Sequence, residues 1–155
     1  MRVMQVEKYP LPCLVLLLAL GLGSARAGDT LAEEPGLSAL PVLAEQWGTE
    51  NPYRGDARVA AIGQTLFVAH CQRCHGENAS GRGPAPDLRV LGRYCMRIAD
   101  GELHARCMRD ADDYFRRSVQ FGKVRMGVVH MQPWKDVLSQ EAIWALRTYV
   151  GTRAQ

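Results

Sequence analysis

Helical periodicity dominates the pattern of apolar and polar positions along this chain of 155 residues. In residues 56–70, Val59, Ile62, Leu66 and Phe67 follow the three- and four-residue spacing of one helix face. The aspartate that opens this segment has the side chain of an N-cap. The pattern therefore predicts an amphipathic helix over residues 56–70.

Two later segments repeat the same helical period. The first covers residues 110–120 and has Gly122 as its stop signal. The second begins after Ser139, an N-cap residue, runs to about Val150 and ends at Gly151. No segment has convincing strand alternation, so the chain is predicted to be all-α. The stretch between these two helices is expected to be a loop.

Residues 1–27 have the layout of a cleaved export signal. Basic residues precede a short apolar run, residues 11–23, and Ala25-Arg26-Ala27 is a small-residue cleavage site. The run is about 13 residues, short of the ~20 that a membrane-spanning helix needs, so cleavage is favoured over anchoring. The mature chain then begins at Gly28, and Cys13 leaves with the signal.

Residues 28–52 are predicted to form an N-terminal arm. Proline and glycine recur along them, and the stretch is too short to bury a core of its own. A helical turn is expected within it, at residues 42–47. We expect the arm to wrap the surface of the remainder, residues 53–155, which has the size of one domain.

The segment Cys71-Gln72-Arg73-Cys74-His75 carries the strongest chemical motif of the chain. Two thiols separated by two residues and followed at once by histidine are typical of covalent c-type haem attachment. Cys71 and Cys74 would form the thioethers, and His75 would be the proximal iron ligand. A thioredoxin-type redox pair would need a strand–helix–strand context, and a zinc site would need a second Cys/His pair at finger or ribbon spacing. Neither is present in the sequence, so one covalent haem c is expected.

Two further cysteines remain in the mature chain. In an oxidising periplasm, the compartment that export and haem attachment indicate, Cys95 and Cys107 can form a disulfide. They flank a short polar stretch, residues 96–106, which is expected to be a loop with a solvated His104. Closing so small a loop would stabilise the fold by roughly 3 kcal/mol. Two buried free thiols are the alternative.

Charge excludes little beyond one class of partner. The chain has 19 lysine and arginine residues against 16 aspartate and glutamate residues. The balance stays near neutral once the signal is removed, and the basic residues are scattered. No nucleic-acid partner is therefore expected, and no stable membrane insertion is expected after signal cleavage.

The far side of the iron decides between an electron carrier and a catalyst. Met131 is the leading candidate, because nearby proline and glycine give it a rigid, non-helical presentation. A thioether ligand raises the reduction potential and fills the coordination site. The alternative for Met131 is an ordinary core methionine. Met126 and His130 are the rival ligands, whereas His70 lies too close to the attachment segment to reach the far side.

The order of these motifs resembles that of a class I cytochrome c. The resemblance implies an all-α class I fold whose N- and C-terminal helices cross near Gly63, around one covalently bound haem. It implies that the Pro86 carbonyl binds the imidazole of His75 and that Leu88 packs on the haem. Trp134 would either bind a propionate or pack. The matching segments are Cys71-x-x-Cys74-His75, Ala85-Pro86-Asp87-Leu88, Met131-x-Pro133-Trp134 and Ile143–Tyr149.

A closer resemblance, over most of the mature chain, is to the soluble cytochromes c associated with quinoprotein (PQQ) alcohol dehydrogenases. It implies a periplasmic one-electron acceptor, not an enzyme. Such a protein takes electrons from the reduced quinone enzyme and passes them to a terminal oxidase. The chain departs from that family at Gln132, where proline is usual. The resemblance rests on residues 51–55, residues 85–91, the Cys95/Cys107 pair and Asp112-Asp113-Tyr114.

Two questions stay open at the sequence level. A haem enzyme or sensor with a labile sixth ligand, such as a peroxidase or a gas-binding protein, is the alternative function, and a bound Met131 argues against it. The basic residues Lys123, Arg125, Arg82 and Lys135 form either a patch that steers a redox partner or an ordinary solvated face.

Overall fold

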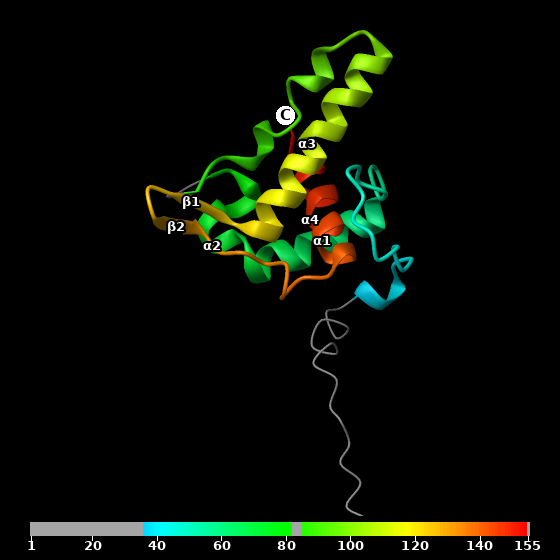
Figure 1. Ribbon diagram of the computed structural model, residues 1–155. Helices are drawn as coiled ribbons and strands as arrows, with labels where there is room; N and C mark the ends of the chain where they lie inside the picture. The colour runs from blue at the N-terminus through cyan, green and yellow to red at the C-terminus, as the bar shows by residue number, and fades with distance from the viewer. Residues whose placement is uncertain (1–35, 82–84, 155) are drawn as a thin grey trace, which may run out of the picture.

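Helices dominate the computed structural model, which describes residues 36–81 and 85–154 (Figure 1). The predicted signal peptide, the first part of the predicted arm and Arg82 lie outside these described residues. The all-α prediction is confirmed. The helices are α1 (Ala57–His70), α2 (Gln72–His75), α3 (Gly101–Phe121) and α4 (Gln140–Arg153), with 3₁₀ turns η1 (Leu37–Ala39), η2 (Glu77–Ala79), η3 (Leu88–Val90) and η4 (Cys95–Arg97).

Helices α1 and α4 cross closely, and Gly63 allows it. A Cβ at Gly63 would collide with the Ala145 carbonyl and would lie 3.0 Å from the Cβ of Tyr149. Beside this crossing the rings of Phe67 and Tyr149 are 5.2 Å apart. The predicted close crossing at Gly63 is therefore confirmed, and it places the end of α1 firmly against the core.

The core is centred on α4. Every residue of this helix from Ala142 to Val150 is buried, including Arg147 and Thr148. Helices α1 and α3 and the arm before α1 cover it from different sides (Figure 1). A single apolar stripe, the pattern expected from the sequence, is therefore too narrow a description of α4.

Side-chain caps fix the starts of the helices. Asp56 accepts hydrogen bonds from the amides of Arg58 and Val59, at 2.8 and 3.3 Å, and Ser139 accepts one from Ala142 at 3.2 Å. Both predicted N-caps are confirmed. These caps satisfy amides that have no partner within the helix.

The predicted end of α4 is wrong. The helix continues through Gly151 to Arg153. A glycine ends a helix by taking a left-handed backbone conformation, and Gly151 is not among the glycines with positive φ.

Helix α3 is longer than predicted. It begins at Gly101, where Asp100 accepts a hydrogen bond from the Leu103 amide at 2.8 Å. His104 and Cys107 therefore lie on a helix, and the expected loop over residues 96–106 is wrong. This first half of α3 is largely exposed, and its apolar row, Leu103, Cys107 and Ala111, is sparse, so the sequence pattern there is weak. The predicted stop at Gly122 is confirmed.

The stretch after Gly122 is a β-hairpin, not the predicted loop. Strand β1 (Lys123–Arg125) pairs antiparallel with β2 (Val128–Met131), with a register irregularity after Lys123. Met126 and Gly127 form the turn with φ values of 48° and 77°. The strands were not predicted because their valines, at 59–63% exposure, show no alternation between an apolar and a polar face.

The described part of the arm is held by the N-terminal turn of α4. The Leu43 amide donates to Glu141 Oε1 at 2.8 Å, and the Gly48 amide donates to Gln140 at 3.3 Å. Burial raises the pKa of Glu141, but hydrogen bonds from the Leu43 amide, its own amide and Ser139 outweigh it and leave the pKa lowered. The helical turn predicted at residues 42–47 is absent, and the arm instead has η1 at Leu37–Ala39.

A buried carboxylate joins the end of the arm to α3 and α4. Asp112 is fully buried and accepts from the Asn51 amide and from Arg147 Nε, both at 2.8 Å. Arg54 donates to the same carboxylate. Burial lowers the pKa of Arg147, and the neighbouring Asp112 carboxylate opposes that effect. The network makes the arm an integral part of the domain.

Candidate haem-attachment site

The attachment motif is a single helical turn. Cys71 closes α1, and the short helix α2 follows it directly. The amides of Cys74 and His75 both donate to the Cys71 carbonyl, at 3.1 and 2.9 Å. This turn brings two thiols and an imidazole together, as the spacing in the sequence predicts.

The two thiols differ in their surroundings. Cys71 is half-buried against the hydrophobic core, whereas Cys74 is exposed. Burial, with a smaller contribution from Cys74, raises the pKa of the Cys71 thiol to about 12. Neither is part of a disulfide, in contrast to Cys95 and Cys107.

The imidazole of His75 is buried and anchored on one side. Its Nδ1 lies 3.1 Å from the Pro86 carbonyl oxygen, which can only accept, so Nδ1 carries the proton. The Gly81 amide donates to the backbone carbonyl of His75 at 2.7 Å. Ring and backbone of His75 are thus both fixed by the loop that follows it, which leaves Nε2 as the free ligand atom.

The other predicted contact residues border the core around this turn. Leu88 begins η3 and Met131 ends β2, and Trp134 lies three residues after Met131. All three, like Cys71, are partly exposed apolar residues packed against the buried cluster. Partly exposed apolar side chains gathered at the edge of a core suit a large, flat apolar group. These residues therefore fit a haem held by Cys71 and Cys74.

The structure separates Met131 from its rivals. Met126 is fully exposed at the hairpin turn, and His130 is exposed on β2. The ring of His70 meets Trp134 edge-on at 5.5 Å. His104 lies on α3, remote in the fold from α2 (Figure 1). Among the candidates for the sixth ligand, Met131 is the one packed against the core.

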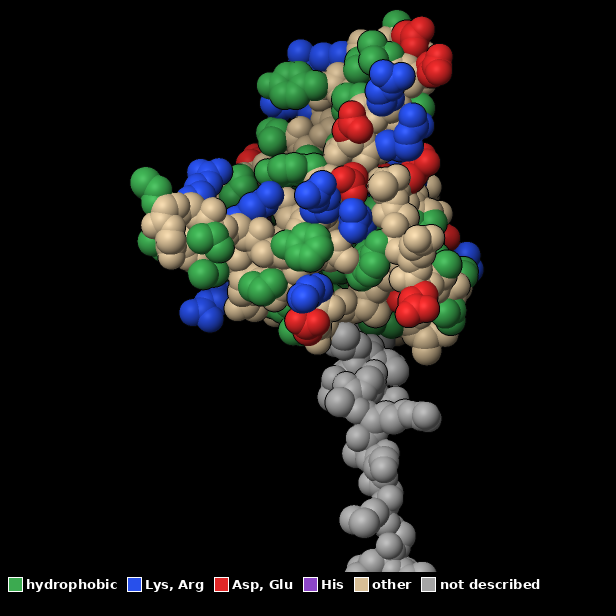
Figure 2. Space-filling view, in the orientation of Figure 1, with side chains coloured by type: hydrophobic (Ala, Val, Ile, Leu, Met, Phe, Trp, Pro, Cys, Tyr) green, Lys and Arg blue, Asp and Glu red, His purple; other side chains and the backbone are tan. Residues whose placement is uncertain are grey.

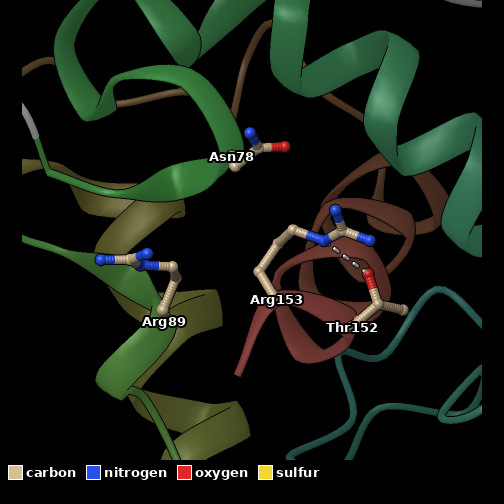
Figure 3. A pocket seen from close by; sticks show the side chains of 4 residues that line it. All are labelled: Asn78, Arg89, Thr152 and Arg153. Carbon is tan, nitrogen blue, oxygen red and sulfur yellow. Dashed lines mark hydrogen bonds between the residues drawn. The ribbon is translucent and has the colours of Figure 1, made fainter. Parts of the chain in front are cut away.

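Two open hollows lie beside the loop that follows the attachment turn, on residues 77–80. One, of about 400 Å³, is lined by Asn78, Arg89, Thr152 and Arg153 (Figure 3), and a neighbouring one of about 490 Å³ shares Asn78 and Arg89. Arg89 is forked onto Asp87, and Arg153 Nε donates to Thr152. Their guanidinium groups already have partners, so these hollows are ordinary polar surface.

Cys95 and Cys107 are bonded to each other. Their Cα atoms are 5.6 Å apart, and the bond ties η4 to the first half of α3. This part of the molecule projects beyond the core, away from α2 and the hairpin (Figure 1). The disulfide thus closes an extension of the domain and does not touch the attachment turn.

The helical fold and the attachment turn together define a c-type cytochrome. The family described as cytochrome C oxidase, cbb3-type, subunit III matches residues 58–150. Cytochrome c550 of Pseudomonas aeruginosa (strain PAO1) is 34% identical over 143 residues, which cover 88% of this chain and 89% of that protein. This chain therefore belongs to the cytochrome c family, with the class I fold and a covalently attached haem c, and is a monohaem electron carrier.

A solved structure is also similar to this chain. It is cytochrome CL from the marine methylotrophic bacterium Methylophaga aminisulfidivorans, with 21% identity and a TM-score of 0.47. The match covers 66% of this chain and 58% of that one. Within the described residues, no helix combines the length and the apolar character needed to cross a membrane.

Proposed function

We propose that this cytochrome is a periplasmic one-electron carrier in which His75 and Met131 are the axial ligands of the iron. The observation that carries the proposal is the 3.1 Å contact between His75 Nδ1 and the Pro86 carbonyl. With Nδ1 as the donor, Nε2 keeps its lone pair for a metal, and the hydrogen bond holds the ring in one orientation. Cys71 and Cys74, on the same turn, are the proposed covalent attachment points.

Met131 is proposed to bind the iron from the side opposite His75. It is the last residue of the hairpin strand β2, is half-buried and packs against the core. The haem, when attached, supplies the one-electron exchange between ferric and ferrous iron. The chain keeps both ligands in place, which keeps the rearrangement that accompanies electron transfer small. Leu88 and Trp134 are proposed to pack against the haem, and we propose a carrier rather than an enzyme.

Export is part of the proposal. Residues 1–27 are the proposed signal, residues 28–52 the arm, and residues 53–155 the haem domain. The Cys95–Cys107 disulfide is consistent with an oxidising compartment, because such bonds persist in the periplasm. Cys74 is exposed and lies outside this disulfide, which is consistent with its proposed role in covalent haem attachment.

We propose a quinoprotein alcohol dehydrogenase as the donor and an oxidase that accepts electrons from c-type cytochromes as the acceptor. The support is the sequence resemblance in residues 51–55 and 112–114. The structure shows that Asn51 and Arg54 both donate to the buried carboxylate of Asp112, and all three belong to those segments. The resemblance therefore rests on residues that interact, not on isolated identities.

Docking is proposed to be transient and small, as is usual for redox encounters. Figure 2 shows apolar side chains at the hairpin end of the molecule with basic side chains on both sides of them. Arg125, on β1, and Lys135, in the segment after β2, are exposed, while the Lys123 ammonium lies 4.4 Å from the centroid of the Tyr114 ring. Cations around an apolar area suit a partner with an acidic rim.

The test is direct reduction by the proposed donor. The holoprotein is mixed in a stopped-flow instrument with the purified quinoprotein alcohol dehydrogenase of the same organism and its alcohol. We expect haem reduction at a rate that falls as ionic strength rises. Ascorbate, which reduces the haem without docking, is the control. A protein that ascorbate reduces and the dehydrogenase does not would contradict the assignment of the donor.

A further inference from the structure

The segment that contains Met131 is fastened to the end of α3. The Trp134 amide donates to the Val119 carbonyl at 3.0 Å, and the Lys135 amide donates to the Gln120 carbonyl at 3.3 Å. The last carbonyls of a helix have no partner within it. Here they anchor the chain just after Met131, so the end of α3 is a fixed reference for that residue.

Gly122, the residue that ends α3, lies directly against this segment. Its φ is +67°, and its amide donates to the Ser118 carbonyl at 3.0 Å. A Cβ at this position would collide with the Met131 carbonyl oxygen and would lie 2.8 Å from the Gln132 carbonyl carbon and 2.9 Å from the Pro133 nitrogen. Each of these neighbours is backbone, so no change of side-chain rotamer would make room.

The hairpin fixes the other side of the same contact. Lys123, next to Gly122, pairs with Met131 in the ladder between β1 and β2. Met131 therefore has a ladder partner on one side and hydrogen bonds to α3 just beyond it. Between these two attachments its carbonyl rests where the side chain of residue 122 would be.

We propose that Gly122 is a positioning residue for the sixth iron ligand. By lacking a Cβ it lets the backbone of Met131 approach α3, and this approach sets where the thioether stands. The inference rests on the proposed function, because it takes Met131 as the ligand. The usual proline at position 132 would stiffen the chain next to Met131. Because Gln132 replaces it here, the proposed bond between Met131 and the iron depends more on the contact at Gly122.

The proximal side of the site has a similar construction. A Cβ at Gly81 would collide with the Asp87 amide and would lie 2.7 Å from the Pro86 carbonyl carbon. Gly81 thus holds the residue whose carbonyl binds His75. Gly81 lies against the segment that holds His75, and Gly122 lies against the segment that contains Met131. A substitution at Gly122 therefore tests the Met131 side alone.

The experiment compares Gly122→Ala with Gly127→Ala in holoprotein matured with covalent haem. Gly127 is the matched control, since its φ is +77° in the same hairpin and a Cβ there meets nothing within 4 Å. The readouts are the red thioether-to-ferric-iron band, the reduction potential and the affinity of the ferric protein for added imidazole. We expect Gly122→Ala to lose the band, to have a lower potential and to bind imidazole about tenfold more tightly, a change that corresponds to about 1.4 kcal/mol.

The outcomes separate this inference from the function it rests on. Gly127→Ala should keep the wild-type band and imidazole affinity. If Gly122→Ala also keeps both, the inference about Gly122 is overturned while Met131 remains the ligand. If the wild type itself has no thioether band, the proposed ligand is wrong, and the role of Gly122 is lost with it.

A second measurement needs no variant and covers a Gly122→Ala protein that does not fold. In the wild type, hydrogen exchange at the Trp134 and Lys135 amides is followed as denaturant removes the thioether band. The inference predicts that both amides open together with loss of the band, because one attachment to α3 controls both. Amides that stay protected after the band has gone would overturn it.

Discussion

At the scale of single residues, two close approaches between backbone segments depend on glycine. Gly63 lets α4 cross α1 at the Ala145 carbonyl, and Gly122 lets the chain at Met131 lie against α3. The first contact was predictable from the sequence, because a glycine in the middle of an amphipathic helix suggests a close crossing. The second was not, because the residues that lie against Gly122 are at the end of a hairpin that the sequence pattern does not predict.

The clash at Gly63 gives a stability prediction. Alanine favours a helix over glycine by about 1 kcal/mol, but overpacking against a neighbour that cannot move typically costs about 1–3 kcal/mol. Because the atom in the way is backbone, the cost lies at the upper end of that range, and we expect Gly63→Ala to lower the free energy of unfolding by up to about 2 kcal/mol, measured by urea unfolding of the holoprotein.

The control for this prediction is Gly151→Ala. Gly151 also lies within a helix, but its nearest contact is the end of the Arg147 side chain at 3.7 Å. Helix propensity should then decide the sign and stabilise the protein by about 0.5–1 kcal/mol. Equal stabilisation by both substitutions would show that α1 and α4 do not approach as described.

Among the individual site residues, those of the attachment turn were the easiest to predict. The spacing of Cys71, Cys74 and His75 is a local property, and α2 needs no distant contact to bring them together. The contact of His75 with Pro86 followed only from family resemblance, because its partners come from different turns.

At the scale of elements, the sequence predicts what local chemistry controls. Helices α1 and α4 were predicted at their starts because Asp56 and Ser139 are caps, and these act within one turn. The first half of α3 was missed, although Asp100 is also a cap, because most of its residues are polar and exposed and its apolar row is sparse. The hairpin was missed because Val128 and Val129 are both exposed, so no alternation marks β2.

The hydrogen bonds of Asp112 join the arm, α3 and α4, and they lead to a second stability prediction. Asp112 is fully buried and Arg147 is 2% exposed, so removing the carboxylate leaves a buried cation without its partner. Breaking a buried pair in this way typically costs about 3–5 kcal/mol. We expect Asp112→Ala to destabilise by about that amount, measured by thermal and urea unfolding.

Asp113→Ala is the comparison on the same helix. Its carboxylate is 28% exposed and pairs with Arg116, which is 13% exposed and also donates to Gln120. Because solvent reaches this pair and Arg116 keeps a second partner, we expect Asp113→Ala to destabilise by about 1 kcal/mol, well below Asp112→Ala. A loss at Asp112 no larger than that at Asp113 would show that the arm does not depend on the network.

At the scale of the whole molecule, the protein is a cytochrome c domain with two additions. The arm lies along the N-terminal turn of α4 and joins the core through Asn51. The Cys95–Cys107 bond closes a projection that lies away from the attachment turn (Figure 1). Neither addition contains the attachment turn or Met131, which lie on the central helices and the hairpin.

The central claim is that His75 and Met131 are the axial ligands of a haem held by Cys71 and Cys74. Its most direct test is the visible spectrum of the purified holoprotein, oxidised and reduced, with and without Met131→Ala. The account predicts a low-spin wild type with the thioether-to-ferric-iron band, and a high-spin variant without it. A wild type that is already high-spin and binds carbon monoxide readily would contradict the account and favour a haem enzyme or sensor.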